Sequence, residues 1–378
     1  MNARTPRRTA VRRTAIAVTA AASAFSLAAC GVIDSAGGSS GSAEPKKGDD
    51  ITVGLLLPDK KTKRFEKLDY PLFKKQVTAL TSGKGKVLYA NAEADKAKQN
   101  RQLEEMIAKK VDVLVVDAID AKTIAPSIEK AKDADIPVIA YDRLAEGPID
   151  AYVSHDNELV GEVQGRSIIE ALGTKAATSK IVMINGSVTD PNTALFEDGA
   201  MTELEGKVQI AASYNTKDWL PEVAKAHMET AIQSVGLNDI DAVYSANDGM
   251  AGAAIDALKE AGASKIPPVT GQDADLAAVQ RIVSGEQYMS VYKSFILEAN
   301  NAASIAVAKV QGRGIEFDAL TRDTVDSPTE KKIPSMLVPV VALTQDNIKD
   351  TVIQDGVYTV QDICTPEYAA ACAEIGLE

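Results

Sequence analysis

Planar polar side chains occur in this sequence where strand-like segments end. Residues 136–143 read IPVIAYDR, an apolar run around a proline that finishes in an acid, Asp142, and a base, Arg143. Such a run is typical of a parallel strand that helices cover on both faces. Ligands of open α/β sheets bind just beyond the carboxyl ends of the strands. A carboxylate and a guanidinium together offer acceptors and donors to hydroxyl groups, so the expected chemistry is sugar recognition.

Other expected strands end in side chains of the same kind. These are Asp190, Asn192, Asn247 and Asp273. Any one of them could instead cap the following helix, where Asp and Asn are favoured, and we expect Asp248 to do only this. The recurrence of such groups in both halves of the chain favours one shared cleft over a set of unrelated caps.

Two aromatic side chains are candidates for covering the faces of a sugar ring. Trp219 is the only tryptophan and lies in the polar turn KDWLP, where the alternative is a surface or staple role. An indole face suits the apolar C–H face of a pyranose. Phe65, in KRFE after the first expected strand, could cover the opposite face of the ring.

Strands and helices alternate along the chain in two successive runs. In the first run we expect strands at 51–58, 86–90, 111–116 and 136–143, and helices at 70–80, 100–109 and 123–133. In the second run we expect strands at 149–153, 180–184, 208–212, 242–245 and 268–270, and helices at 159–172, 194–204, 221–235 and 251–261. A long helix at 294–311 and a late strand at 336–341 follow. This alternation predicts two α/β sandwiches of similar fold, each with a parallel sheet flanked by helices.

Length and charge set further bounds. The chain has 378 residues, of which 45% are apolar, so two domains with sizeable cores are expected. The net charge is −12, and acids and bases are interspersed beyond the first 30 residues. No basic face of the kind that nucleic acid requires is expected.

The first 30 residues predict an export signal. Five arginines precede an apolar stretch at 15–27, which is too short for an ordinary membrane span. The stretch ends in LAAC, which resembles a bacterial lipobox whose cysteine, here Cys30, is lipidated and becomes the mature N-terminus. The alternative is a simple secretory signal with a chance cysteine. Residues 31–50 are rich in Gly and Ser and predict a flexible tether, so we expect an extracytoplasmic protein anchored to the cell membrane.

Cys364 and Cys372 remain as a pair in an exported protein, which favours a disulfide. A straight helix would separate their Cα atoms by about 12 Å, beyond the roughly 7 Å that a disulfide allows. The chain must therefore bend between them, for which Thr365-Pro366 is the candidate. The alternative is two separate thiols.

Several short motifs together resemble the periplasmic sugar-binding proteins of bacterial ABC importers, and among them the D-xylose-binding proteins. The resemblance covers about 51–344. Its motifs are KRF at 63–65, AYDR at 140–143, DN at 156–157, DPN at 190–192, WLPE at 219–222, AND at 246–248, GQDADL at 271–276 and VYK at 291–293. It implies the type I periplasmic binding protein fold, in which two lobes joined by three crossover segments enclose one monosaccharide.

The resemblance also implies lobe boundaries. The N-terminal lobe would comprise 51–153 and 294–330, and the C-terminal lobe 154–293 and 331–378. The crossovers would fall near Val153-Ser154, Lys293-Ser294 and Lys331-Lys332. The terminal segment that carries Cys364 and Cys372 lies outside the resemblance.

The resemblance further implies which side chains contact the sugar. Those expected to hydrogen-bond its hydroxyls are Arg64, Asp142, Arg143, Asp190, Asn192, Asn247, Asp273 and Lys293. Trp219 and Phe65 would cover the two ring faces. The chain departs from the xylose-binding pattern at Phe65, where tryptophan is expected, and at Pro191, where asparagine is expected. These departures leave the exact sugar open between D-xylose and a related aldopyranose.

The implied function is capture of a monosaccharide for an ABC permease by a monomer without a cofactor. A glycosidase needs a carboxylic acid that keeps its proton. Arg64, Arg143 and Lys293 would instead favour ionised carboxylates in the same cleft. His155 and His227 are isolated in the sequence, so neither a metal site nor a nucleophile–base pair is apparent.

Two further functions are compatible with such a fold. A regulator of the lactose-repressor type would need an N-terminal helix-turn-helix, and this chain has an export signal there. A receptor that reports sugar occupancy to a membrane sensor stays open, because such a sensor and a permease would both contact the closed lobes.

Overall fold

The structure is a computed structural model that describes residues 47–377. The predicted export signal, Cys30 and most of the predicted tether lie outside the described residues. Within residues 47–377, no helix is both long and apolar enough to cross a membrane. The α/β class predicted from the alternation of strands and helices is confirmed.

The first sheet has seven strands. In spatial order they are β10 (Asp323–Val325), β11 (Ile333–Val338), β5 (Ala151–His155), β4 (Val138–Tyr141), β3 (Val113–Val116), β1 (Thr52–Leu57) and β2 (Lys86–Asn91). All neighbours are parallel except β10 and β11. This sheet and the helices on it are called the first lobe.

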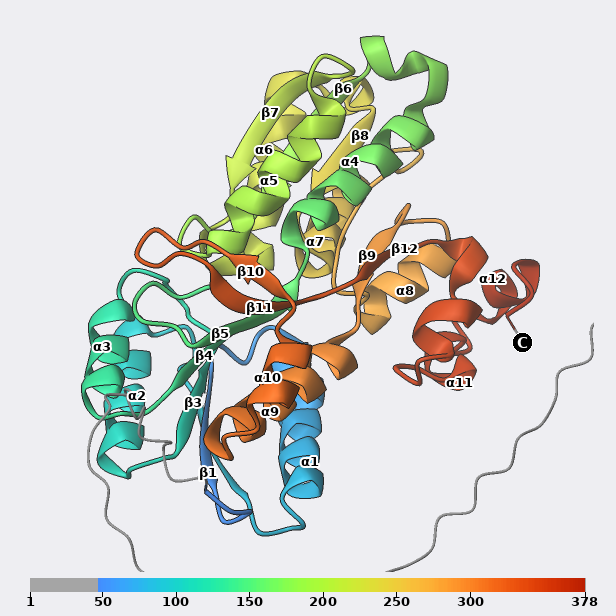
Figure 1. Cartoon of the computed structure of the whole chain (residues 1–378). Coiled ribbons are helices and arrows are strands. Elements are labelled where there is room, and N and C mark those ends of the chain that lie inside the picture. The colour runs from blue at the N-terminus through green and yellow to red at the C-terminus, as the bar shows by residue number, and fades with distance from the viewer. Residues whose placement is uncertain (1–46, 378) are drawn as a thin grey trace, which may run out of the picture. The chain divides into compact units, whose positions relative to one another are not determined.

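Alternating side chains of the first sheet face opposite helix layers, as the period of two in a strand requires. Val53, Leu55 and Leu57 of β1 pack with α1 (Tyr70–Leu80) and α9 (Phe295–Val310). Leu56 faces the other way and packs with α2 (Lys96–Ala108) and α3 (Ala125–Asp133). Figure 1 shows α1 beside α9 and α2 beside α3. Because both faces are covered, the central strands β3 and β4 are buried and apolar throughout.

The second sheet consists of a parallel and an antiparallel part. β6 (Lys180–Asn185) lies between β7 (Gln209–Asn215) and β8 (Ala242–Ser245), and β9 (Ser290–Lys293) pairs with β12 (Val340–Leu343). Residues 268–273 connect the two parts through single bridges, from Val269 to Val243 and from Gln272 to Val291. The strand expected at 268–270 is therefore only a single bridge at Val269, and β9 was not predicted.

The helices that surround this sheet form with it what is called the second lobe. They are α4 (Asn157–Leu172), α5 (Pro191–Leu204), α6 (Pro221–Val235), α7 (Asp248–Glu260) and α8 (Leu276–Val283). α6 begins and ends at the predicted residues, whereas α8 was not predicted. The amino ends of α5 and α7 follow the carboxyl ends of β6 and β8, so both helices begin at the edge where a ligand would bind.

Three segments cross between the lobes, after β5, after β9 and after β11. β11 pairs with β5 in the first sheet, whereas β12 pairs with β9 in the second. The single strand expected at 336–341 is thus two strands in different sheets, divided at Pro339, which cannot donate a ladder hydrogen bond. β11, which follows the Lys331-Lys332 position expected for the third crossover, pairs with β5 in the first sheet.

The C-terminal segment packs on the second lobe. α11 (Val360–Ile363) and α12 (Ala369–Glu374) are joined by the disulfide between Cys364 and Cys372, whose Cα atoms are 5.9 Å apart. The chain bends between these helices, so the two cysteines approach within disulfide range. Apolar side chains of this segment form a cluster with α8 and β9, and Figure 1 shows it beside α8. A short helix, α10 (Gly314–Leu320), lies on the first lobe.

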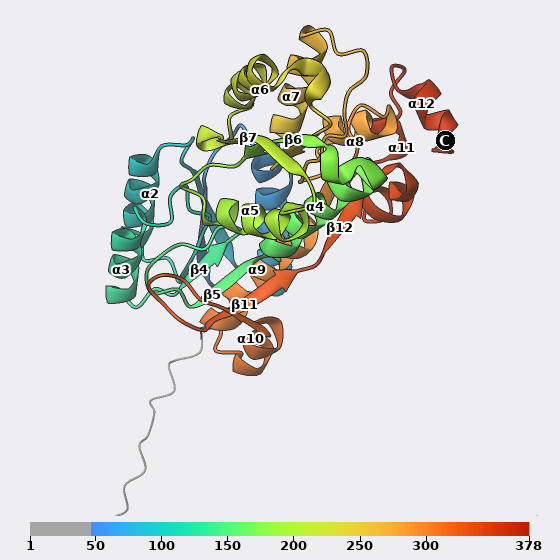
Figure 2. The same ribbon diagram turned by 90° about the horizontal axis from the view of Figure 1, so that it is seen from above.

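Glycines allow α4 and α5 to touch backbone to backbone. A Cβ atom at Gly199 of α5 would lie 2.0 Å from the carbonyl oxygen of Glu158, and one at Gly161 of α4 would lie 2.1 Å from that of Phe196. Figure 2 shows the two helices side by side. This contact sets the position of α5, and with it the residues at the amino end of α5.

Gly199→Ala is expected to destabilise the protein by about 1–3 kcal/mol, because the added methyl group forces the two helices apart. Urea denaturation would measure the change. Gly314→Ala is the matched control, because a Cβ atom there meets nothing within 4 Å. Equal stability of both variants would show that α4 and α5 do not depend on this close contact.

Candidate functional site

One cavity between the lobes is lined by every residue that the sequence analysis selected for sugar binding. These residues are Arg64, Phe65, Asp142, Arg143, Asp190, Asn192, Trp219, Asn247, Asp273 and Lys293. Thr62, Phe196 and Gln272 line the same cavity and were not predicted. These residues lie together because β1, β4, β6 and β8 all direct their carboxyl ends to this place, where ligands of α/β sheets bind.

The Arg64 side chain lies at the centre of a buried ion cluster. It precedes a π-helical turn at Phe65–Asp69 that leads into α1. Its Nη2 atom lies 2.8 Å from Asp69 Oδ1 and 3.0 Å from Glu298 Oε2, and its Nη1 atom lies 2.8 Å from Asp142 Oδ2. Its guanidinium lies over the Phe295 ring, with the carbon 3.7 Å from the ring centre. Only 5% of Arg64 is exposed, so these contacts replace water as partners.

The carboxylates around Arg64 differ in their protonation. Burial raises the pKa of Glu298 well above its usual value, and the nearby charges of Asp142 and Asp69 add to this effect. Burial also opposes ionisation of Asp142, but the positive charges of Arg64, Lys293 and Arg143 outweigh it and lower the pKa of Asp142 to about 2. Asp142 therefore presents a charged acceptor to the cavity at neutral pH.

His155 is not isolated, contrary to its appearance in the sequence. Its Nδ1 atom lies 3.6 Å from Glu298 Oε1, and its ring packs edge-on against Phe295. Burial, together with the positive charges of Lys293 and Arg64, lowers the pKa of His155 well below its usual value. His155 is thus a neutral neighbour of Glu298 at the end of β5, where the chain first crosses between lobes.

Side chains at the end of β4 reach across to the second lobe. Arg143 Nε lies 2.7 Å from Asp190 Oδ2. The Asn192 amide donates to the side chain and to the backbone oxygen of Asp142, each over 3.1 Å. Asp190 and Asn192 start α5, so these contacts connect the first sheet to the helix that the glycine contact positions.

The second-lobe side of the cavity carries Lys293 and Asp273, with Nζ and Oδ1 2.9 Å apart. Lys293 ends β9 immediately before the chain crosses to α9. Burial opposes the charge on Lys293, but Asp273 and Asp142 raise its pKa, so the ammonium group stays protonated. The cavity therefore holds charged donors and charged acceptors from both lobes.

Asn247, and not Asp248, caps α7. The Asn247 side chain accepts from the Met250 N–H over 2.9 Å, so its amide nitrogen is the group it offers to the cavity. Asp248 instead accepts from Gln287, from Ser290 and from the Asp275 N–H over 2.8, 2.8 and 2.9 Å. The prediction for Asp248 was wrong because its side chain turns inward, where distant parts of the second lobe supply donors.

Trp219 is held at the cavity wall by three contacts. Its Nε1 atom donates to Asp190 Oδ2 over 3.1 Å, and its ring meets Phe196 edge-on with centroids 6.2 Å apart. A Cβ atom at Gly186 would lie 2.2 Å from the indole, so only glycine leaves room for the ring. Trp219 itself has a φ of +57°, an uncommon backbone conformation for such a residue. Phe65, by contrast, is 2% exposed and belongs largely to the first-lobe core.

Two kinds of residue at this site were not predicted from the sequence. Phe196 lies one helical turn after Asn192, so the helical period could have placed it in the cavity. Glu298 could not be found in this way, because it touches Arg64 only through the packing of α9 on the first lobe. Asp69 lies five residues after Arg64, at the end of the π-helical turn that Arg64 precedes. Among residues 47–377, no group of three or more potential metal ligands occurs. The arrangement can thus offer many hydrogen bonds and two aromatic surfaces to a polar, uncharged ligand.

Known proteins resemble this chain over most of its length. Residues 53–314 match a family model described as periplasmic binding protein domain. The D-xylose-binding periplasmic protein of Escherichia coli (strain K12) is 36% identical over 320 residues, which cover 83% of this chain and 93% of that protein. The multiple sugar-binding periplasmic receptor ChvE of Rhizobium radiobacter is 32% identical over 336 residues, which cover 82% and 92% of the two chains.

A solved structure shares the fold. It is the ABC transporter solute binding protein from Clostridium phytofermentans with bound β-D-glucose. It superposes with a TM-score of 0.76 at 29% identity and covers 82% of this chain and 99% of that chain.

Glu298→Gln is expected to be at least as stable as the parent at pH 7, because the amide resembles the protonated carboxyl group and does not ionise in the unfolded chain. Glu298→Ala should destabilise by about 3–5 kcal/mol, since it leaves the buried Arg64 without one of its partners. Urea denaturation would compare the two variants. A Gln variant as unstable as the Ala variant would show that Glu298 is ionised.

The same pair predicts a pH dependence. The folded-state pKa of Glu298 is raised. Its contribution to the free energy of unfolding is therefore full below the unfolded pKa of about 4.3 and is lost as the pH rises through the folded pKa. The Gln variant should lack this decline, which denaturation at a series of pH values would detect.

Proposed function

The chain belongs to the periplasmic binding protein family as a sugar-binding protein of the type I fold, and from this premise we propose that it captures a monosaccharide and delivers it to an ABC importer. D-xylose or a related aldopyranose is the proposed ligand. The D-xylose-binding relative, 36% identical, supports the pentose. The relative named as binding multiple sugars and the structure with bound β-D-glucose support a wider choice among aldopyranoses.

The observation that carries this proposal is the composition of the cavity. Hydroxyl groups of a sugar both donate and accept, so they need carboxylates and amides as well as guanidinium and ammonium groups. Asp142, Arg143, Asn192 and Lys293 supply both kinds within one cavity. Trp219 and Phe196 add the apolar surface that a pyranose face requires.

The proposed mechanism is opening and closing of the two lobes about the three crossover segments. We assign residues 51–153 and 294–338 to the N-terminal lobe and 154–293 and 339–378 to the C-terminal lobe. Asp142 and Arg143 come from one lobe, and Asp190 and Asn192 from the other. A sugar that hydrogen-bonds both pairs binds the closed state better and shifts the population toward it.

A receptor that reports sugar occupancy to a membrane sensor is the second candidate. The Rhizobium radiobacter relative is named as a receptor, which keeps this function open. Both functions use the same closed, sugar-bound form. Catalysis is not part of either, and the relatives are named as binding proteins.

Isothermal titration calorimetry against pentoses and hexoses is expected to find at least one aldopyranose that binds, with D-xylose among the tightest. Arg143→Ala should weaken the binding of this sugar at least tenfold. The substitution leaves buried acceptors unpaired, which costs roughly 1–3 kcal/mol or more. Binding should also change the fluorescence of Trp219, the only indole in the chain.

Arg166→Ala is the matched control for the calorimetry, since that arginine is half exposed and pairs with Glu203 on the surface of the second lobe. No binding of any sugar in the panel would overturn the proposed function. Equal affinity of the parent and Arg143→Ala would remove Arg143 from the site.

We also propose that Cys30 carries a lipid that anchors the mature protein outside the cytoplasm. The LAAC motif after an Arg-rich, apolar leader supports this proposal. Cys30→Ser should release the protein into the medium or block its maturation, because stable anchoring needs acyl chains. Membrane fractionation would detect the change, and a normally processed, membrane-bound Cys30→Ser protein would contradict it.

A further inference from the structure

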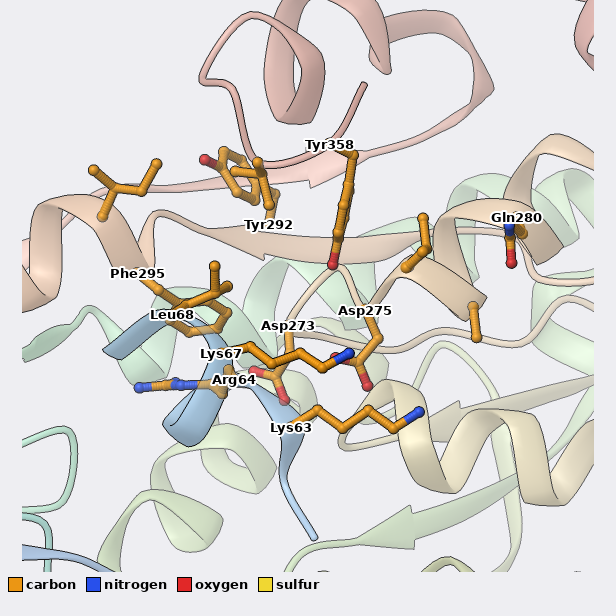
Figure 3. Close-up of a pocket in the computed structure, with 14 residues that line it drawn as sticks. Lys63, Arg64, Lys67, Leu68, Asp273, Asp275, Gln280, Tyr292, Phe295 and Tyr358 are labelled. Atoms are coloured by element: carbon orange, nitrogen blue, oxygen red, sulfur yellow. The ribbon is translucent and has the colours of Figure 1, made fainter. Parts of the chain in front are cut away.

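A second cavity of about 270 Å³ lies beside the sugar cavity (Figure 3). The two cavities share Arg64 and Asp273 in their walls. The start of α1 and the segment before it form one side of the second cavity, and α8 and the C-terminal segment form the other. None of its remaining residues is used by the proposed binding of a single sugar ring.

Two tyrosines with hydrogen-bonded hydroxyl groups give this second cavity an apolar wall. The Tyr358 hydroxyl donates to the Ala274 carbonyl over 3.1 Å, and the Tyr292 hydroxyl donates to Asp355 Oδ2 over 2.6 Å. Their hydroxyls are therefore satisfied, and what they offer the cavity is ring surface. Figure 3 shows Tyr358 and Tyr292 on the side opposite Lys63 and Lys67. Such a surface is suited to the C–H face of a sugar ring.

Unpaired polar groups face the same space. In the part of the chain that the structure describes, the ammonium groups of Lys63 and Lys67 and the carboxylate of Asp275 have no hydrogen-bond or ion-pair partner. Figure 3 shows these three side chains pointing toward one region. Burial, and then the charge of Asp273, raises the pKa of Asp275 to about 6. A partly buried carboxylate without a partner is unfavourable, and a hydroxyl donor would relieve it.

The second cavity carries charged groups of both signs. Lys63 and Lys67 contribute ammonium groups and Asp275 contributes a carboxylate, whereas Asp273 pairs with Lys293. Arg64 directs its guanidinium to its own three carboxylates. The hydroxyl groups of a neutral ligand both donate and accept, so they can bind groups of either sign. The volume lies just below the roughly 300 Å³ at which small-molecule pockets begin, which suits one ring and no more.

We propose that the second cavity is a subsite for a second sugar ring, so that the protein binds a disaccharide as well as a monosaccharide. This proposal rests on the proposed function, because the first ring must occupy the cavity at Asp142 and Arg143. The second ring lies against Tyr358, and its hydroxyls bind Asp275 and the two lysines. Tyr358 is thereby a determinant of ligand length.

Calorimetry with D-xylose, D-glucose and their β-1,4-linked disaccharides, xylobiose and cellobiose, tests the subsite. At least one disaccharide is expected to bind with a Kd within about tenfold of its monosaccharide. Tyr358→Ala should raise the Kd of that disaccharide about tenfold, because ring contact and apolar burial are lost. The Kd of the monosaccharide should stay within about twofold of that of the parent. Tyr358→Phe keeps the ring and should retain disaccharide binding.

Tyr288→Ala is the matched control, because Tyr288 is 38% exposed and lines neither cavity. Should Tyr358→Ala fail to fold, Asp275→Asn carries the same comparison, with disaccharide binding weakened and monosaccharide binding kept. A protein that binds a monosaccharide and neither disaccharide overturns the subsite alone. A Tyr358→Ala variant that binds the monosaccharide and the disaccharide equally more weakly than the parent also overturns it. Failure to bind any sugar overturns the proposed function itself.

Discussion

The buried guanidinium of Arg64 is the interaction on which the binding cavity depends. It joins Asp69 at the start of α1, Asp142 at the end of β4 and Glu298 on α9, three parts of the first lobe that are far apart in the chain. A buried charge is tolerated only when its partners are in place, so these parts must be assembled together. Asp142 is thereby held ionised and directed toward Asn192 of the second lobe.

The cavity also depends on backbone conformations that most residues avoid. Asp142, Trp219 and Asp273 have φ values of +59°, +57° and +95°. Such conformations persist only where the surrounding structure enforces them, and they concentrate at functional sites. Here each one turns a side chain into the cavity just after an element ends. The Arg64 cluster and the Asp190–Trp219 hydrogen bond supply contacts that hold two of these three turns.

Packing within the second lobe positions the residues that meet the first lobe. The glycines of α4 and α5 bring the backbones of these helices into contact, and α5 begins with the residues that face Asp142 and Arg143. The C-terminal segment packs on α8 and β9 and brings Tyr358 to the second cavity. The disulfide between Cys364 and Cys372 limits the freedom of this segment in the unfolded chain, which favours its folded arrangement.

The sequence by itself determined the α/β class, most helices and strands, and most of the residues that line the cavity. The class and the elements follow from local periodicity, and Asp142, Asp190 and Asn247 follow from the rule that ligands bind at the carboxyl ends of parallel strands. Arg64 and Lys293 were expected only from the resemblance to the sugar-binding family. Only the tertiary structure decided which partners these residues have. Glu298 reaches Arg64 across 234 positions of sequence, and β11 and β12 part at Pro339 because they pair in different sheets. Likewise, Asp248 is an internal acceptor and Tyr358 lines the second cavity. Local spacing carries no information on such contacts, because the order in which strands pair sets the distance between residues remote in the chain.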